Sequence, residues 1–227
     1  MNTYRKTAII VGVLFIIGTV AGVLSKGFSV PILRDPNYLI KVSENQNLVI
    51  ASLLVLTMGL SLAMMSVVLF PILKKHNEAL ALGAVVFRGA LEAVMYIAVV
   101  ICWLLLLTVS QEYVKAGAPD ASHFQTLGTL LLKADGQTSG ITSIVFSLGA
   151  LMIYYVFYQS KLIPRWLSAW GIIAAIPYLA EGLITVFGTK LEILDMPLAL
   201  QEMVMALWLI VKGFNPSPIA SESAKTE

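Results

Sequence analysis

Four long stretches without a charged side chain constrain the fold of this chain more than any other feature. Each covers 19 to 29 consecutive residues, and they are Thr7–Ser25, Asn45–Leu73, Ala93–Gln111 and Gly136–Ser160. About 18 to 20 mainly apolar residues in a helix suffice to cross about 30 Å of hydrocarbon. The 227 residues are 58% apolar and 12% charged, with a mean hydropathy of +0.86. This composition predicts an integral membrane protein and excludes an ordinary water-soluble enzyme.

We predict an all-α transmembrane bundle of six spans that forms a single integral membrane domain over residues 1–216. The last two spans are interrupted by Glu181 and Glu202, so a count of four or five spans is the main alternative. The first span is too long for a cleavable signal, whose apolar run covers about 7 to 15 residues, so we expect it to be retained. The predicted spans cover about residues 7–25, 48–70, 79–109, 139–159, 167–187 and 196–212.

Basic residues in the predicted connections indicate the orientation of the bundle. With six spans, eight Lys and Arg residues lie on the side of the two termini and six lie on the opposite side. Cytoplasmic connections carry an excess of basic residues, so we expect both termini to be cytoplasmic. Residues 217–227 are rich in Ser, Pro and charge, and this composition predicts a disordered cytoplasmic tail.

The connection between the third and fourth spans carries a helical pattern of its own. Residues 122–125 read Ser-His-Phe-Gln, the pattern of a helix N-terminal capping box. Phe124, Leu127, Leu131 and Ala134 then fall near one face of a helix. We therefore expect an amphipathic helix at about residues 122–135 that lies on the outer leaflet, as a cover over the bundle rather than a moving lid.

The chain shows no motif for a cofactor, a metal ion or a catalytic residue. Its single Cys102 and its two histidines, His76 and His123, cannot supply a Cys/His zinc site or a multi-His metal centre. The net charge is +2 and no basic run occurs, which argues against a nucleic-acid partner. The expected partners are the lipid bilayer and a small-molecule ligand, and the oligomeric state is left open.

Four ionisable residues fall inside the predicted spans: Arg88, Glu92, Glu181 and Glu202. Each costs about 2.5 to 3.5 kcal/mol to insert, so each should face the interior of the bundle. At 1.5 Å per residue, Glu92 and Glu181 lie about 20 Å from the terminal side and Glu202 about 15 Å from it. We therefore expect three carboxylates in one layer near the midplane, with Arg88 one turn away on the face of Glu92.

The residues of this layer suggest two different roles. One arginine neutralises one glutamate, so in a dry layer the surplus carboxylates should hold protons, as proton-coupled transport or cation binding requires. The candidate binding or proton-coupling residues are Arg88, Glu92, Glu181, Gln201 and Glu202. Gln201 projects about 100° away from Glu202, so we expect one of these two to face the cluster. The alternative is a static polar lock that fixes helix packing.

An intramembrane enzyme that uses a glutamate as acid or base is a remoter hypothesis, because the chain offers no accompanying nucleophile or metal set. Three strings point to a family instead. They are Leu69–Gly83 leading to Phe87–Glu92, then Leu162–Gly171, and Leu198–Met203 continuing through Trp208 to Lys212–Pro216.

These strings resemble a bacterial family of multi-pass membrane proteins that is catalogued as domain of unknown function 4386. The resemblance covers about Arg5 to Pro216. It implies a protein of the bacterial cytoplasmic (inner) membrane with several spans, and it carries no established activity. Arg88, Glu92, Gln201 and Glu202 lie within the matching strings, whereas Glu181 lies outside them.

Overall fold

The computed structural model describes residues 3–44, 46–116 and 121–216, and this part of the chain is helical without any strand. Six of its helical segments are long and apolar enough to cross a membrane, which confirms the predicted all-α bundle and the count of six spans. The predicted tail, residues 217–227, lies outside the described residues.

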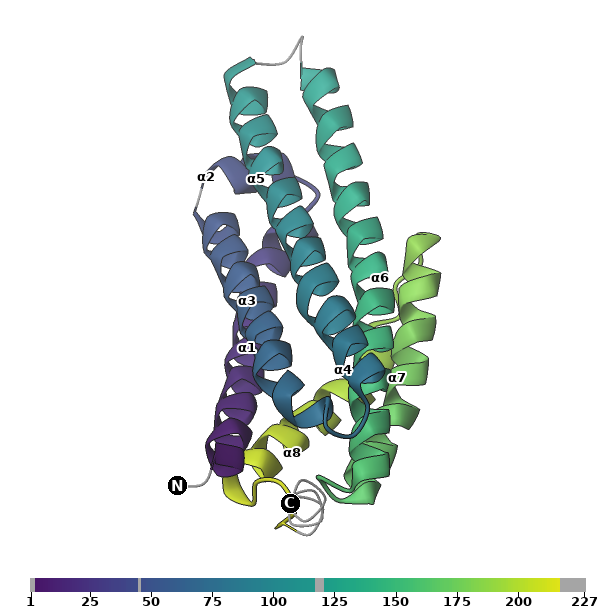
Figure 1. The fold of residues 1–227 in the computed structure, drawn as a ribbon. Helices are drawn as coiled ribbons and strands as arrows, with labels where there is room; N and C mark the ends of the chain where they lie inside the picture. The colour runs from purple at the N-terminus through teal and green to yellow at the C-terminus, as the bar shows by residue number, and fades with distance from the viewer. Residues whose placement is uncertain (1–2, 45, 117–120, 217–227) are drawn as a thin grey trace.

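Figure 1 shows the elements in chain order. The six spans are α1, α3, the continuous run of α4, η1 and α5, then α6, α7, and η2 with α8. Several spans are longer than predicted, because their helices continue past the apolar segment. The elements are α1 (Thr3–Leu33), α2 (Tyr38–Glu44), α3 (Asn47–Leu73), α4 (Glu78–Ala84), η1 (Val85–Leu91), α5 (Glu92–Ala116), α6 (Ala121–Ser160), α7 (Arg165–Val186), η2 (Glu192–Asp195) and α8 (Met196–Val211).

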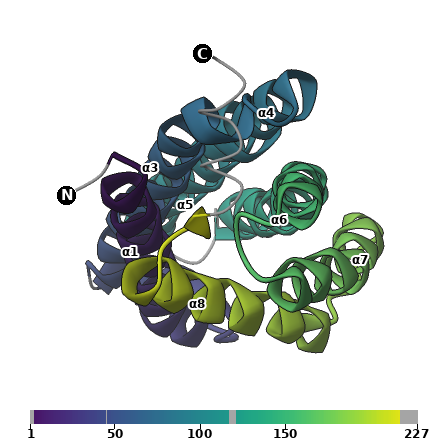
Figure 2. The same cartoon turned by 60° about the horizontal axis from the view of Figure 1, so that its bottom comes forward.

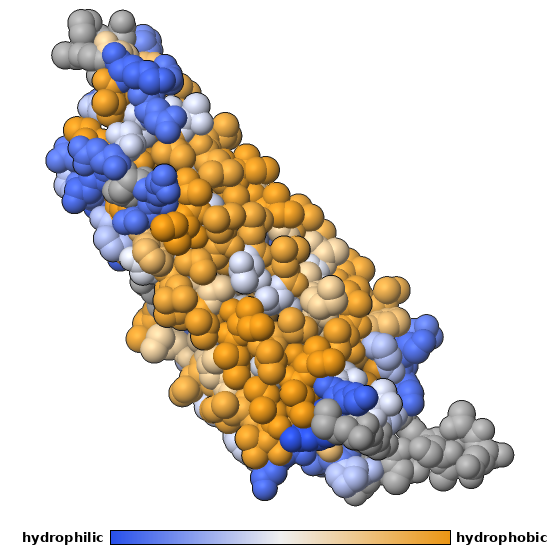
Figure 3. All heavy atoms as spheres, turned by 90° about the vertical axis from the view of Figure 1, so that its left-hand side faces the viewer, coloured by the Kyte–Doolittle hydropathy of each residue, from blue (hydrophilic) through white to orange (hydrophobic). Residues whose placement is uncertain are grey.

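The outer surface of the bundle is apolar along most of its length. Large apolar side chains such as Val23, Leu60 and Ile173 are about two-thirds exposed, at 65%, 66% and 66%. Figure 3 shows one face of the molecule, with hydrophobic residues over the middle and hydrophilic residues towards both ends. Apolar side chains that face outward along a whole helix are stable only in lipid, which agrees with a multi-pass membrane protein.

The six spans form a closed ring. Each span packs against the next one along the chain, and α8 packs back against α1. Figure 2, an oblique view in which the lower end of Figure 1 comes forward, shows α8 running between α7 and α1. Arg5 of α1 donates hydrogen bonds to the backbone oxygens of Leu209, Ile210 and Val211, at 3.2, 2.6 and 3.2 Å. These carbonyls end α8 and lack partners within the helix, so Arg5 caps α8 and closes the ring.

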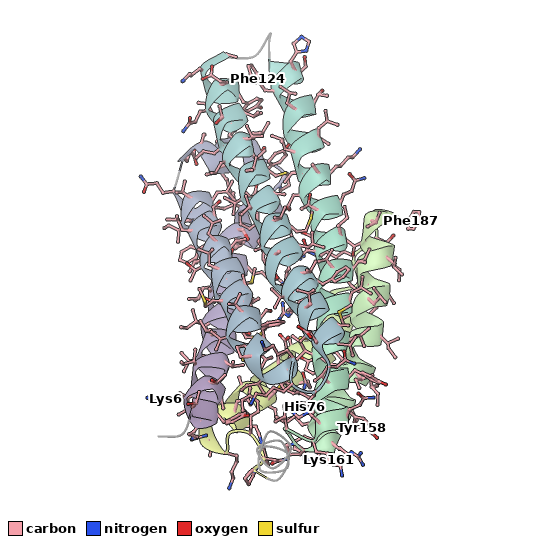
Figure 4. All side chains as sticks on the ribbon, in the orientation of Figure 1. Lys6, His76, Phe124, Tyr158, Lys161 and Phe187 are labelled. Atoms are coloured by element: carbon pink, nitrogen blue, oxygen red, sulfur yellow. The ribbon has the colours of Figure 1, made fainter. Side chains whose placement is uncertain are left out.

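The start of α1 and the end of α8 therefore lie at the same end of the bundle, which we call the terminal end (Figure 1). The opposite end is the distal end. Figure 4 shows Lys6, His76 and Lys161 at the terminal end and Phe124 at the distal end. Which end faces the cytoplasm stays a prediction from the basic residues of the connections.

The expected surface helix over residues 122–135 is corrected by the structure. This segment is the first part of α6, one uninterrupted helix of 40 residues and about 60 Å, so it continues the fourth span instead of lying across the outer leaflet. No proline interrupts residues 121–160. Leu131 and Leu132 pack on the apolar core cluster that includes Trp103 and Leu106 of α5. The lower part of the segment's apolar face therefore serves helix pairing, whereas Leu127 remains 47% exposed.

Candidate functional site

Arg88 lies within a local widening of its helix. The span runs from α4 through the π-helical segment η1 and on into α5, and Arg88 is the fourth residue of η1. Short π-helical insertions are rare and occur often at functional sites. On the facing helix α6, a methyl group at Gly149 would lie 2.6 Å from the backbone nitrogen of Arg88. The absence of a side chain at Gly149 therefore allows α6 to pack directly on the turn that carries Arg88.

Arg88, Glu92 and Glu202 form an ion-pair cluster, which we call the Arg88 cluster. Nη1 of Arg88 donates hydrogen bonds to both carboxylate oxygens of Glu92, one turn along the same helix. Nη2 donates to Oε1 of Glu202 on α8 at 3.0 Å. The side chains of Arg88 and Glu92 are each 1% exposed and that of Glu202 is 10% exposed. The cluster therefore joins the third and sixth spans inside the ring.

Aromatic side chains surround the Arg88 cluster. The guanidinium carbon of Arg88 lies 3.7 Å from the centre of the Phe146 ring, a close cation–π contact. The Phe146 ring in turn lies 4.8 Å from the ring of Tyr178 on α7, centre to centre. Tyr96 of α5 lies one turn beyond Glu92 on the same face of the helix. Such walls exclude water, so the ion pairs inside them are stronger than in solvent.

Tyr154 is the member of the site that links α6 to Glu202. Its hydroxyl donates a hydrogen bond to Oε1 of Glu202 at 3.3 Å, the same oxygen that Arg88 contacts. The Tyr154 ring is 1% exposed, and a methyl group at Gly171 of α7 would lie 2.8 Å from that ring. Close packing by α7 therefore fixes the position of the hydroxyl.

Tyr154, Phe146 and Tyr178 are site residues that were not predicted from the sequence. Aromatic residues in an apolar span are most often packing residues or interface anchors, so their type alone gives no signal. Depth gives no signal either, because Tyr154 lies in the last two turns of α6, next to Tyr155, where interface anchors are expected.

Gln201 faces a different partner from Glu202, as expected from their angular separation. Its side-chain amide donates to the backbone oxygen of Leu167 on α7 at 3.1 Å. The amide oxygen of Gln201 and the hydroxyl of Ser168 are both buried and have no hydrogen-bond partner among the described residues. Gln201 therefore belongs to the contact between α7 and α8 and not to the Arg88 cluster.

Glu181 is buried, but its described contacts do not connect it to the Arg88 cluster. It is 2% exposed, and its Oε1 accepts a hydrogen bond from Thr185, one turn further along α7, at 2.7 Å. None of the contacts described for Glu181 joins it to Arg88. Of the five residues selected from the sequence, the structure therefore brings together Arg88, Glu92 and Glu202, and it leaves Gln201 and Glu181 outside.

The chemistry of the cluster follows from its charges. Two carboxylates share one guanidinium, so the site holds one more acidic group than basic group. Within residues 3–44, 46–116 and 121–216, no three His, Cys, Asp or Glu side chains are grouped so that they could hold a metal ion. The arrangement therefore suits the binding of a proton or of another single positive charge.

The closed ring of apolar spans defines a polytopic helical membrane protein. The chain belongs to the family described as Domain of unknown function (DUF4386), which matches residues 10–213 and thus all six spans. It is also similar to an uncharacterized protein of Archaeoglobus fulgidus, with 31% identity over 78 residues. That match covers 34% of this chain and 48% of the relative, so the chain spans about half of the relative's length. No solved structure matches the chain.

Proposed function

We propose that this protein binds or transports a small solute in the cytoplasmic membrane with proton coupling, and that Glu202 carries the coupled proton. The observation that supports the proposal is the presence of two carboxylates on one guanidinium in a buried layer. If both carboxylates were ionised, one negative charge would be buried without compensation. Because an uncompensated buried charge is very costly, the cluster is most stable when it holds one proton.

Glu202 is the better of the two carboxylates for exchanging that proton. Glu92 receives two hydrogen bonds from Arg88 on its own helix, whereas Glu202 receives one from Arg88 and one from Tyr154. Glu202 is also the most exposed member of the cluster, at 10% compared with 1% for the other two. A proton on Glu202 would weaken its contact with Arg88, and with it the link between α8 and η1. Proton uptake and helix movement would thereby be coupled.

Infrared difference spectroscopy tests the proton directly. Purified protein in lipid is brought from acidic to alkaline pH, and the carbonyl stretch of a protonated carboxylic acid is followed. We expect a pH-dependent band that Glu202→Gln removes. Glu181→Gln is the matched control, because Glu181 is also buried but is bonded to Thr185 instead of Arg88. Absence of a pH-dependent band, or a band that Glu202→Gln leaves in place, would overturn the proposal.

A transport assay tests the solute. Proteoliposomes loaded with a pH-sensitive dye are exposed to solutes grouped by class: inorganic cations, amines, organic acids and neutral molecules. We expect one class to cause proton movement through the wild type and the Glu181→Gln variant. The Glu202→Gln variant should lose that movement while it remains folded.

A second candidate function is a static lock that holds the ring together. The packing of Gly149 on the backbone of Arg88 and the Phe146 ring on its guanidinium favour it, because both restrict movement. For a lock, Glu202→Gln would lower thermal stability, and the wild type would show neither a pH-dependent carboxylic acid nor proton movement.

A further inference from the structure

Buried polar side chains gather on the distal side of the Arg88 cluster. Ser139, Ser143 and Ser147 recur every four residues along α6, so they lie on one face of that helix. Ser143 and Ser147 are buried, and the face continues on α7 with Tyr178 and the buried Thr185. We call the side chains of Ser139, Thr142, Ser143, Ser147, Tyr178 and Thr185 the hydroxyl face.

The terminal side of the cluster has the opposite character. A continuous apolar core fills the ring between the cluster and the terminal end. The buried polar exceptions there include Ser168 and Gln201, at the contact between α7 and α8. This apolar core therefore separates water at the terminal end from the Arg88 cluster. The core on this side includes Leu69, Leu73, Phe157, Leu162, Leu167 and Leu209, each at most 1% exposed.

Tyr178 lies at the junction between the hydroxyl face and the cluster. It lies beside Ser143, and its ring contacts Phe146, which covers the Arg88 guanidinium. The Tyr178 and Phe146 rings therefore separate the polar side of the ring from the cluster.

The distal end of the hydroxyl face is less covered than the rest. Helix α7 ends at Val186, and Figures 1 and 4 show its end, marked by Phe187, well below the distal tips of α5 and α6. Beyond this point, Ser139 is partly buried, and Asp135 is near Trp103 and Lys190. Polar groups thus extend from the end of α7 down to the cluster.

We propose that water reaches the Arg88 cluster from the distal end along the hydroxyl face, that the Tyr178 and Phe146 rings close this route, and that the terminal end is sealed. In the structure α6 and α7 pack directly on each other over this face, because a methyl group at Gly182 of α7 would lie 2.8 Å from Cβ of Ser143, so the entry of water requires these two helices to separate. Along this route, the proton of the proposed function enters from the distal end. The role of the route in transport rests on that proposed function.

Sided cysteine labelling tests the route. Cys102 is first replaced by serine, and a cysteine is introduced at Ser143 or, as the matched control, at Ser168. Both are buried serines, one on each side of the cluster. Membrane vesicles of each orientation are treated with a small anionic methanethiosulfonate, and the remaining thiols are counted by a mass tag after denaturation.

We expect Ser143→Cys to react from the distal side alone, and Ser168→Cys to react from neither side. Adding Tyr178→Ala should raise the rate at Ser143→Cys at least severalfold. Ile141→Cys, a lipid-facing position on α6 that is 42% exposed, reports any reagent that enters through lipid. Reaction from the terminal side, equal reaction at Ser168→Cys, or no reaction at Ser143→Cys even with Tyr178→Ala would overturn the route.

Failure of the route and failure of the proposed function give different results. A route without proton coupling would label Ser143→Cys from the distal side while the infrared band is absent. Proton coupling without this route would give the band and the solute-driven proton movement, with Ser143→Cys unlabelled or labelled from the terminal side.

Discussion

Replacing Arg88 by leucine measures how many protons the cluster holds. In the wild type, one guanidinium and one proton would balance the two carboxylates of Glu92 and Glu202. Without the guanidinium, the buried site is neutral only if it takes up a second proton. A glutamate has an ordinary pKa of about 4.3, so protonating one at pH 7 costs about 3.7 kcal/mol. We expect Arg88→Leu to lose about this much stability at pH 7.

The dependence on pH identifies the proton count. The folded variant holds one proton more than the folded wild type, so its deficit should shrink by about 1.4 kcal/mol for each pH unit of acidification. At pH 5 the deficit should be about 1 kcal/mol. If both carboxylates were ionised in the wild type, the variant would gain two protons, and the change would be about 2.7 kcal/mol for each pH unit.

The measurement is thermal unfolding in detergent between pH 5 and pH 8, followed by the fluorescence of the four tryptophans. For a chain of this length, about 1 kcal/mol corresponds to about 2 to 4 °C in Tm. We therefore expect a loss of about 7 to 15 °C at pH 7 and of about 2 to 4 °C at pH 5. In the double variant Arg88→Leu with Glu92→Gln, one proton again suffices, so the deficit should no longer change with pH. A deficit of Arg88→Leu that is independent of pH, or that has twice the expected slope, would refute the charge count.

Three further predictions use the same unfolding measurement or a topology reporter. Gly149→Ala should cost about 1 to 3 kcal/mol, because its methyl group would meet backbone at 2.6 Å, whereas Gly136→Ala on the same helix meets nothing within 4 Å and should be neutral or stabilising. Arg5→Gln should lower the unfolding free energy by about 1.5 to 3 kcal/mol, because it removes the charged cap of α8. Lys6→Gln should change stability little, and equal losses in the two variants would argue against the cap. A C-terminal fusion to green fluorescent protein should fluoresce and one to alkaline phosphatase should be inactive, if the terminal end is cytoplasmic.

The count of spans and the membership of the cluster could be predicted from the sequence for simple physical reasons. Long uncharged runs determine the spans, and helical rise gives the depth of each ionisable residue, so Arg88, Glu92 and Glu202 could be assigned to one layer. The same count assigned Glu181 to this layer, but depth does not give direction around the ring axis. In the structure Glu181 bonds to Thr185 of its own helix.

Other features depend on contacts that no local pattern contains. The apolar face of residues 122–135 is the same whether it meets lipid headgroups or another helix, and only the packing of Leu131 and Leu132 shows that it meets the α5 core. The π-helical segment around Arg88 likewise has no composition of its own. Tyr154 became recognisable only once its hydroxyl was placed beside Glu202.

Closure of the ring by α8 has a consequence for biosynthesis. Ribosomes make α8 after the other five spans, and this helix supplies both the carbonyls that Arg5 caps and the carboxylate of Glu202. Until α8 is inserted, Arg88 lacks its contact with Glu202, and Arg5 lacks the carbonyls that it binds. The last span therefore completes both the ring and the buried ion-pair cluster, so neither can form fully before synthesis of α8 is finished.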